Sequence, residues 1–142
     1  MRNQLQLLLV ASLCGCVATT PQPDAGAQRV NPVPISPVPI SLALEEIITT
    51  GVRQHLQDPA SAKFGSMVAG ERTLNGRGEI LVCGHVNAKG PTGPYDDKLF
   101  ATRIYPDAGS AFELVAMGDQ PADASLVNST CRAAGLAIPD RG

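Results

Sequence analysis

The sequence has few aromatic residues and little net charge. Its 142 residues include no Trp, two Tyr and three Phe, and the formal net charge is −2. No run of Lys or Arg stands out, so the basic patch of a nucleic-acid-binding surface is missing, and we expect no nucleic-acid partner. The apolar stretch from Leu5 to Leu13 is far shorter than the roughly 20 residues that a membrane-spanning helix needs.

The signatures of common catalytic and metal sites are also missing from the sequence. There is no Gly-x-Ser-x-Gly nucleophile elbow and no phosphate-binding loop with its Lys-Ser/Thr ending. His55 and His85 are the only histidines, and with Cys83 they are too few to complete a zinc site. Asp96 and Asp97 supply too few oxygens for calcium. We therefore expect no metal, no cofactor and no enzymatic activity.

The N-terminal segment predicts export. One positive charge precedes an apolar stretch, as in a secretory signal peptide, and Leu13-Cys14-Gly15-Cys16 follows. These four residues resemble the lipobox of bacterial lipoproteins, with an apolar residue at −3, a small residue at −1 and the modified Cys at +1. The resemblance implies that residues 1–15 are removed and that Cys16 receives acyl chains, which anchor a protein durably in a membrane. The alternative is an ordinary secretory signal that is cut elsewhere.

The residues after Cys16 indicate the membrane to which the protein is sorted. Val17 and Ala18 follow, with no Asp at +2, and in enteric-type lipoprotein sorting this pattern implies the outer membrane. We therefore expect a lipid-anchored protein of the bacterial cell envelope, in the outer membrane and facing the periplasm.

A proline-rich linker is expected over residues 16–40. Its second half contains a tandem repeat, Pro32-Val33-Pro34-Ile35-Ser36 followed by Pro37-Val38-Pro39-Ile40-Ser41. Alternate prolines exclude a helix or a central strand and favour polyproline II. Such a linker can hold a domain up to about 70 Å from the lipid. We expect a passive tether; the alternative is a docking ligand for an aromatic groove.

A helix is expected over residues 41–57. Ser41 is a suitable N-terminal cap, and apolar residues recur at helical spacing as far as Leu56. His55 lies on this apolar stripe, where we expect it to be partly buried. Pro59 ends the helix and begins a short second turn.

Four strands are expected after this helix. Asn75-Gly76 is a hairpin signal because both residues tolerate positive φ. The segment from Lys89 to Asp97 is rich in Gly and Pro and is expected to be a loop. Short connections favour an antiparallel meander. The strands are expected over residues 64–74, 79–88, 99–105 and 111–117.

A C-terminal helix is expected over residues 121–134, with Gly135 as its end. A four-stranded sheet needs one face covered, and we expect the C-terminal helix and the first helix to cover it together. The fold class is therefore α+β, with the domain over residues 41–136 and a loose tail over residues 137–142.

Cys83 and Cys131 are the cysteines that remain once Cys14 leaves with the signal and Cys16 takes the lipid. Disulfides persist in an oxidising compartment. We therefore expect a Cys83–Cys131 disulfide that joins the second strand to the last helix. The alternative is a reactive thiol at Cys83, beside His85.

Two segments resemble a small domain of uncharacterised bacterial exported proteins, which carries DPxSAKF and VCGxVNAK motifs. Here they read Asp58-Pro59-Ala60-Ser61-Ala62-Lys63-Phe64 and Val82-Cys83-Gly84-His85-Val86-Asn87-Ala88-Lys89. Tyr95 and Cys131 match a later Tyr-containing loop and a Cys near the C-terminus. The loop departs from the pattern, since residues 90–94 replace the usual Asn/Ser/Gly run. The resemblance implies a shape rather than an activity.

Asn87, Lys89 and Tyr95 are the candidate recognition residues. Asn87 lies just before the Gly- and Pro-rich loop, and Lys89 and Tyr95 lie within it. Binding residues are frequently placed on loops that a rigid scaffold positions. Together they could form one polar recognition site. The alternative is that Asn87 only hydrogen-bonds the backbone of the loop.

The anchor, the linker and the missing catalytic set together favour a non-catalytic envelope lipoprotein. We expect it to be held to the membrane through Cys16 and to bind an envelope protein or a cell-wall partner, or to buttress an assembly. The alternatives are a lipoprotein component of a secretion, conjugation or phage-lysis complex and, less favoured, a small enzyme that uses Cys83 and His85.

Overall fold

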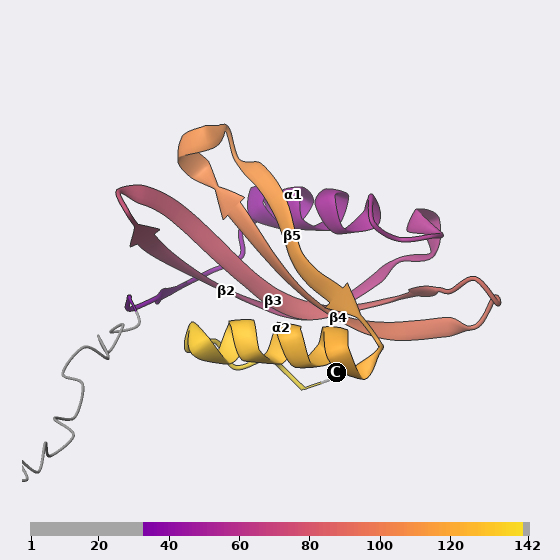
Figure 1. The fold of residues 1–142 in the computed structure, drawn as a ribbon. Helices are drawn as coiled ribbons and strands as arrows, with labels where there is room; N and C mark the ends of the chain where they lie inside the picture. The colour runs from indigo at the N-terminus through magenta and orange to yellow at the C-terminus, as the bar shows by residue number, and fades with distance from the viewer. Residues whose placement is uncertain (1–32, 141–142) are drawn as a thin grey trace, which may run out of the picture. The chain divides into compact units, whose positions relative to one another are not determined.

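The computed structural model describes residues 33–140. The expected signal peptide, residues 16–32 of the expected linker with Cys16 among them, and residues 141–142 of the expected tail lie outside the described residues. None of the helices in the described part is long and apolar enough to cross a bilayer. The elements run in the order β1 (Ser36–Val38), α1 (Leu42–Arg53), a 3₁₀ turn (Pro59–Ser61), β2 (Lys63–Leu74), β3 (Arg77–Lys89), β4 (Tyr95–Tyr105), a second 3₁₀ turn (Pro106–Ala108), β5 (Ala111–Gly118) and α2 (Pro121–Ala133) (Figure 1).

The fold is α+β, with one antiparallel sheet in the order β1-β2-β3-β4-β5. The meander from β2 to β5 agrees with the meander expected from the sequence. The expectation of four strands is wrong, because the sheet has one additional strand at its edge. The additional strand, β1, comes from the segment expected to be a polyproline spacer, and Pro37 pairs with Gly70 of β2. Proline is tolerated at this position because an edge strand has one side on which no ladder hydrogen bond is required.

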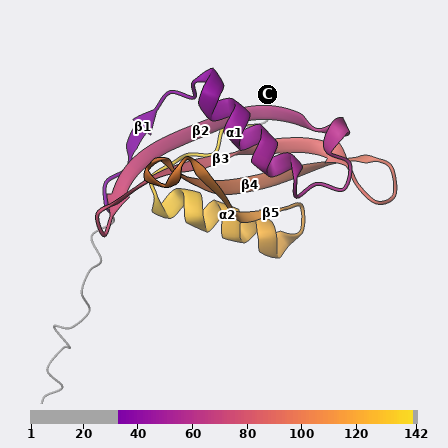
Figure 2. The ribbon, with the colours of Figure 1, turned by 90° about the horizontal axis from the view of Figure 1, so that it is seen from above.

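The two helices cover opposite faces of the sheet, as Figures 1 and 2 show. On one face α1 packs against an α1-side core that includes Val82 and Val86 of β3. On the other face α2 packs against an α2-side core that includes Leu81 and Cys83. The expectation that both helices share one face is therefore wrong. The reason is that β3 is apolar on both faces, so each face needs its own cover.

The helix α1 begins as expected but ends earlier. The hydroxyl of Ser41 accepts a hydrogen bond from the backbone N–H of Leu44 at 3.2 Å, which caps the helix. The helix stops at Arg53, several residues before Pro59. The chain therefore leaves helical geometry before His55, which is exposed, whereas Leu56 still reaches the core. The expectation of a partly buried His55 is wrong.

The connections between strands follow the turn residues. Asn75 and Gly76 have φ values of 51° and 78°, as a two-residue hairpin of the predicted kind requires. The next hairpin is tighter than expected because β4 already begins at Tyr95, where it pairs with Lys89. The loop is therefore confined to residues 90–94.

A bulge in β2 sets the face of its first residues. The pairing between β2 and β3 shifts by one position between Phe64 and Met67. A one-residue shift moves a side chain to the other face of a sheet. Lys63 consequently pairs with Asn87 rather than with Ala88, and so lies on the α2 side of the sheet.

The C-terminal segment completes the layer on the α2 side. Gly135, with a φ of 77°, ends α2 as expected. The chain then turns back, Leu136 is buried, and Ile138 packs against the α2-side core. Within the described residues 137–140 the tail is therefore not loose, since a single helix leaves part of this face for it to cover.

Candidate functional site

Cys83 of β3 and Cys131 of α2 form a disulfide, which confirms the predicted pair. The S–S distance is 2.06 Å and the two Cα atoms are 6.3 Å apart. Both residues are fully buried in the α2-side core. In this state the sulfur of Cys83 holds α2 on the sheet, and no free thiol stands beside His85.

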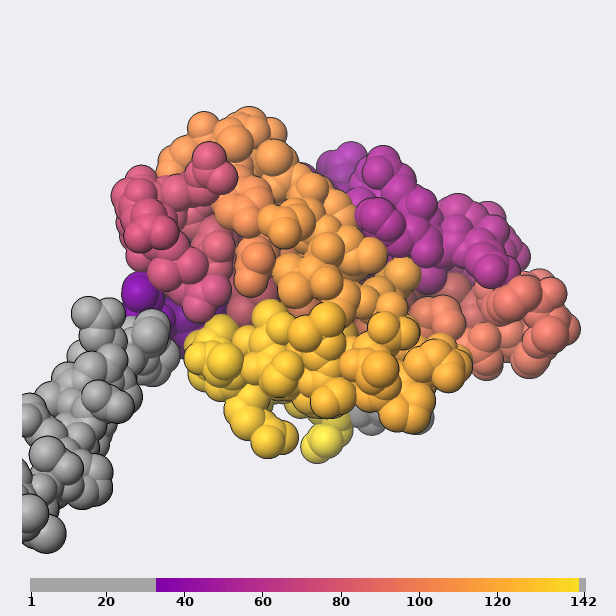
Figure 3. Space-filling view, viewed as in Figure 1, coloured from indigo at the N-terminus to yellow at the C-terminus, as the bar shows by residue number. Residues whose placement is uncertain are grey.

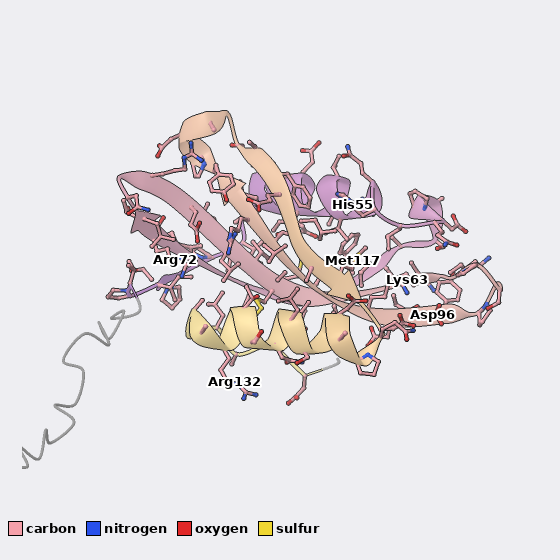
Figure 4. All side chains as sticks on the ribbon, in the orientation of Figure 1. His55, Lys63, Arg72, Asp96, Met117 and Arg132 are labelled. Carbon is pink, nitrogen blue, oxygen red and sulfur yellow. A yellow bond between two sulfur atoms is a disulfide. The ribbon has the colours of Figure 1, made fainter. Side chains whose placement is uncertain are left out.

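Four side chains at the β3–β4 end of the sheet form the candidate site, which we call the hairpin-end surface: Lys63, Asn87, Lys89 and Tyr95. Lys63 pairs with Asn87, and Lys89 pairs with Tyr95. Paired residues share a face, and side chains alternate along β3. All four therefore lie on the same side as Cys83, the α2 side. In Figure 3 the hairpin projects beyond the end of α2, and Figure 4 labels Lys63 at this end.

Tyr95 is the centre of this surface. The Nζ atom of Lys63 lies 5.0 Å from the centroid of the Tyr95 ring, and the Nζ atom of Lys89 lies 5.8 Å from it. The residue Tyr95 is 44% exposed. Exposed cation–π contacts each contribute roughly 0.5–1 kcal/mol, so the two lysines help to orient an aromatic side chain that remains open to solvent.

Ser61 joins the two motif segments physically. Its hydroxyl donates to the carbonyl oxygen of Asp58 and accepts from the backbone N–H of Lys89, both at 2.8 Å. The hydroxyl thereby satisfies a donor at the end of β3, where the ladder with β2 stops. The turn at Asp58 and the end of β3 are thus held together beside the hairpin-end surface.

A shallow pocket of about 350 Å³ opens at the hairpin-end surface. It lies beside the bulge of β2, and its lining combines ammonium, hydroxyl, imidazole, amide and carboxylate groups with one aromatic ring. Its walls are formed by Lys63, Phe64, Gly65, Ser66, His85, Asn87 and Asp97. Of the candidate residues, Asn87 lines the pocket, whereas Lys89 and Tyr95 are not part of its walls.

His85 lies at the floor of the pocket, between two oxygen acceptors. Its Nε2 atom is 3.0 Å from the carbonyl oxygen of Pro139. Its Nδ1 atom is 3.5 Å from Oδ2 of Asp97, which is within ion-pair range, although the geometry is not that of a hydrogen bond. His85 is only 9% exposed. The imidazole therefore connects the tail to the sheet and forms part of the pocket wall.

A second polar cluster lies at the opposite end of the α2 side. Glu79, which is only 6% exposed, contacts the guanidinium of Arg72 at 2.5 Å, and Arg103 Nε lies 3.9 Å from its other oxygen. The hydroxyl of Tyr105 donates to Glu113 at 2.5 Å. This hydrogen bond, followed by desolvation, raises the pKa of Tyr105 above its usual value of 10.0. The cluster satisfies buried charges and so has a structural explanation.

Sequence reasoning did not identify Lys63 or the Arg72–Glu79 pair. The Asn75-Gly76 turn fixes the register of the hairpin and places Arg72 opposite Glu79, so this pair could have been predicted from the turn. The position of Lys63 could not, because the same register without a bulge would place Lys63 on the α1 side of the sheet. Its position in the DPxSAKF segment was the available signal.

The remaining metal candidates are not grouped. Within residues 33–140 no three or more His, Cys, Asp and Glu side chains come close enough to share an ion. Asp96 instead lies 4.0 Å from Lys98, whose ammonium is 3.6 Å from Asp119. A hydrogen bond from its own backbone N–H, followed by the charge of Lys98, lowers the pKa of Asp119.

Comparison with known proteins gives no relative: no family model, no curated protein and no solved structure matches this chain.

Proposed function

We propose that this chain is a lipid-anchored protein of the bacterial envelope whose α+β domain is a non-catalytic binding module. In this proposal Cys16 carries the acyl anchor in the outer membrane. The hairpin-end surface faces the periplasm and contacts an envelope protein or a cell-wall partner.

The convergence of distant segments on one exposed surface carries this proposal. Lys63 comes from the first motif segment, Asn87 and Lys89 come from the second, and Tyr95 opens the following strand. Two ammonium groups lie against one half-exposed ring. An exposed Tyr is more characteristic of a binding surface than of a passive sheet face.

The position of the surface supports presentation to a partner. The first described residues join the sheet through β1, opposite residues 69–71 of β2, whereas the hairpin-end surface lies at the other end of the strands (Figure 1). Eight residues of β3 separate Leu81, which pairs with Gly70, from Lys89. At about 3.4 Å per residue the separation is about 27 Å.

The anchor is tested by comparing two serine substitutions. Cys16→Ser should abolish labelling by radioactive palmitate and release the chain from the membrane fraction. Cys14→Ser changes a neighbouring cysteine that the lipobox does not require, so it should leave acylation and membrane association unchanged. Processing and membrane association of Cys16→Ser that match the parent would contradict the proposed anchor.

The binding role is tested by crosslinking in intact envelopes. Capture of the full chain should recover a reproducible partner, and removal of residues 41–136 should abolish its recovery. Tyr95→Ala should reduce recovery, whereas Tyr105→Ala, at the opposite end of the sheet, should not. A partner set that survives removal of the domain would show that the domain is not the binding module.

A further inference from the structure

The cations on the α2 side of the sheet differ in how they are compensated. At one end, Arg72 and Arg103 contact the carboxylates of Glu79 and Glu113, whereas Arg77 lies over the Tyr105 ring and forms no ion pair within residues 33–140. At the hairpin end, Lys63 and Lys89 form no ion pair with any residue of the described segment 33–140. Both ammonium groups lie near the Tyr95 ring, at 5.0 and 5.8 Å from its centroid, so two positive charges lie beside one aromatic ring.

The pocket beside these lysines has the size and groups of a small-ligand site. Its volume of about 350 Å³ falls within the range of roughly 300–1,000 Å³ of ligand pockets. Asn87 and Ser66 offer neutral hydrogen-bonding groups along the wall. The Asp97 carboxylate, next to His85, also lines this pocket.

We infer that the hairpin-end surface binds the free carboxylate of a short peptide, of the kind that the stem peptides of a bacterial cell wall expose. This inference rests on the proposed function and names its ligand. The carboxylate would lie between the ammonium groups of Lys63 and Lys89. The ring of Tyr95 would contact the adjoining aliphatic side chain, and Asn87 would hydrogen-bond the last peptide unit.

This assignment explains why both lysines occur with neutral and aromatic groups. An inorganic phosphate would use the two charges but not the amide of Asn87 or the open ring of Tyr95. A peptide end uses all of them, because it carries a carboxylate, an amide and an apolar side chain on adjacent atoms. A small pocket also suits a chain end better than an extended protein surface.

Co-sedimentation of the full chain, purified in detergent, with isolated cell-wall sacculi tests the inference. The chain should sediment with the sacculi. A soluble tripeptide with a free C-terminal carboxylate should compete, and the same tripeptide with a C-terminal carboxamide should require a roughly tenfold higher concentration, as the loss of two exposed charge contacts implies. Inorganic phosphate at the same ionic strength should compete weakly.

Matched substitutions assign the effect to this surface. Lys63→Gln combined with Lys89→Gln should weaken sedimentation about tenfold. Arg77→Gln is the control, because Arg77 lies 5.5 Å above the ring of Tyr105 and reproduces the cation–π arrangement at the opposite end of the sheet. Equal competition by carboxylate and carboxamide, equal competition by phosphate, or unchanged binding of the double variant would each overturn the inference.

The outcomes separate this inference from the proposed function. If the chain does not bind sacculi but Tyr95→Ala still loses the crosslinked envelope partner, the assigned ligand is wrong. The proposal that the domain is a binding module is then still supported. If sacculi do not bind and no partner depends on the domain, both are wrong.

Discussion

Ile35 lies directly over Gly70, at the edge of the sheet on the α2 side. A Cβ atom on Gly70 would be 2.7 Å from Cγ1 of Ile35, so only glycine admits this contact. Ile35 belongs to the α2-side core, whereas Ile40, its equivalent five residues later, packs in the α1-side core. Side chains of an extended chain alternate, so an odd repeat places equivalent residues on opposite faces. The two isoleucines of the tandem repeat therefore pack on opposite faces of the sheet at this edge.

Gly70→Ala should loosen this attachment. Overpacking against Ile35 typically costs roughly 1–3 kcal/mol, and we expect faster amide exchange over residues 33–40 measured by mass spectrometry. Gly65→Ala is the matched control in the same strand, because the atom nearest to its added Cβ would lie at 3.5 Å. It should change neither the free energy of unfolding nor the amide exchange of residues 33–40. Adding Ile35→Ala to Gly70→Ala should recover part of the loss, and the absence of any coupling would contradict the contact.

The disulfide should supply a large share of the stability. Cys83 and Cys131 are separated by 48 residues, and the chain-entropy model gives roughly 4 kcal/mol for a loop of this size. Urea unfolding of Cys83→Ala combined with Cys131→Ala should show a loss of this order, and the wild type with reductant should approach the same value. A loss well below 1 kcal/mol would show that packing alone holds α2 on the sheet.

Tyr105 should make the stability depend on alkaline pH. Its pKa is raised in the fold above 10.0, chiefly by the hydrogen bond to Glu113, so the folded chain holds this proton more tightly than the unfolded chain. The contribution is complete below pH 10 and declines as the pH rises through the folded-state pKa. Tyr105→Phe should remove this part of the decline in a profile of unfolding free energy against pH. Tyr95→Phe should retain it.

His85 should hold the tail. His85→Leu removes the contact with the carbonyl of Pro139, and a single hydrogen bond contributes about 1 kcal/mol. Amide exchange over residues 137–140 should therefore become about fivefold faster, with little change in the sheet. His55→Leu alters the other, exposed histidine and is the control. Equal protection of the tail in both variants would mean that Ile138 alone retains it.

The sequence predicted most of the elements because their signals are local. Asn75-Gly76 marked its turn, Ser41 its cap and Gly135 a helix end. The disulfide followed from counting the cysteines that remain.

The errors concern features that depend on tertiary packing. Proline content argued against β1, yet an edge position tolerates Pro37 and the core gains Ile35 from it. The apolar residues on both faces of β3 implied two covering layers, but a single-face sheet was expected. Lys63 was missed because the bulge of β2, which reverses its face, has no strong local signal beyond Gly65. The candidate site was therefore proposed at Asn87, Lys89 and Tyr95, without Lys63.

The most direct test of the account is photocrosslinking from the hairpin-end surface in living cells. A photoreactive phenylalanine derivative is placed at Tyr95 or, as a control, at Tyr105 in the otherwise unaltered chain. The account predicts discrete adducts from position 95, no adducts from position 105, and loss of the position-95 adducts when Cys16→Ser is added. The same adducts from both positions, or adducts from position 95 that persist without Cys16, would contradict it.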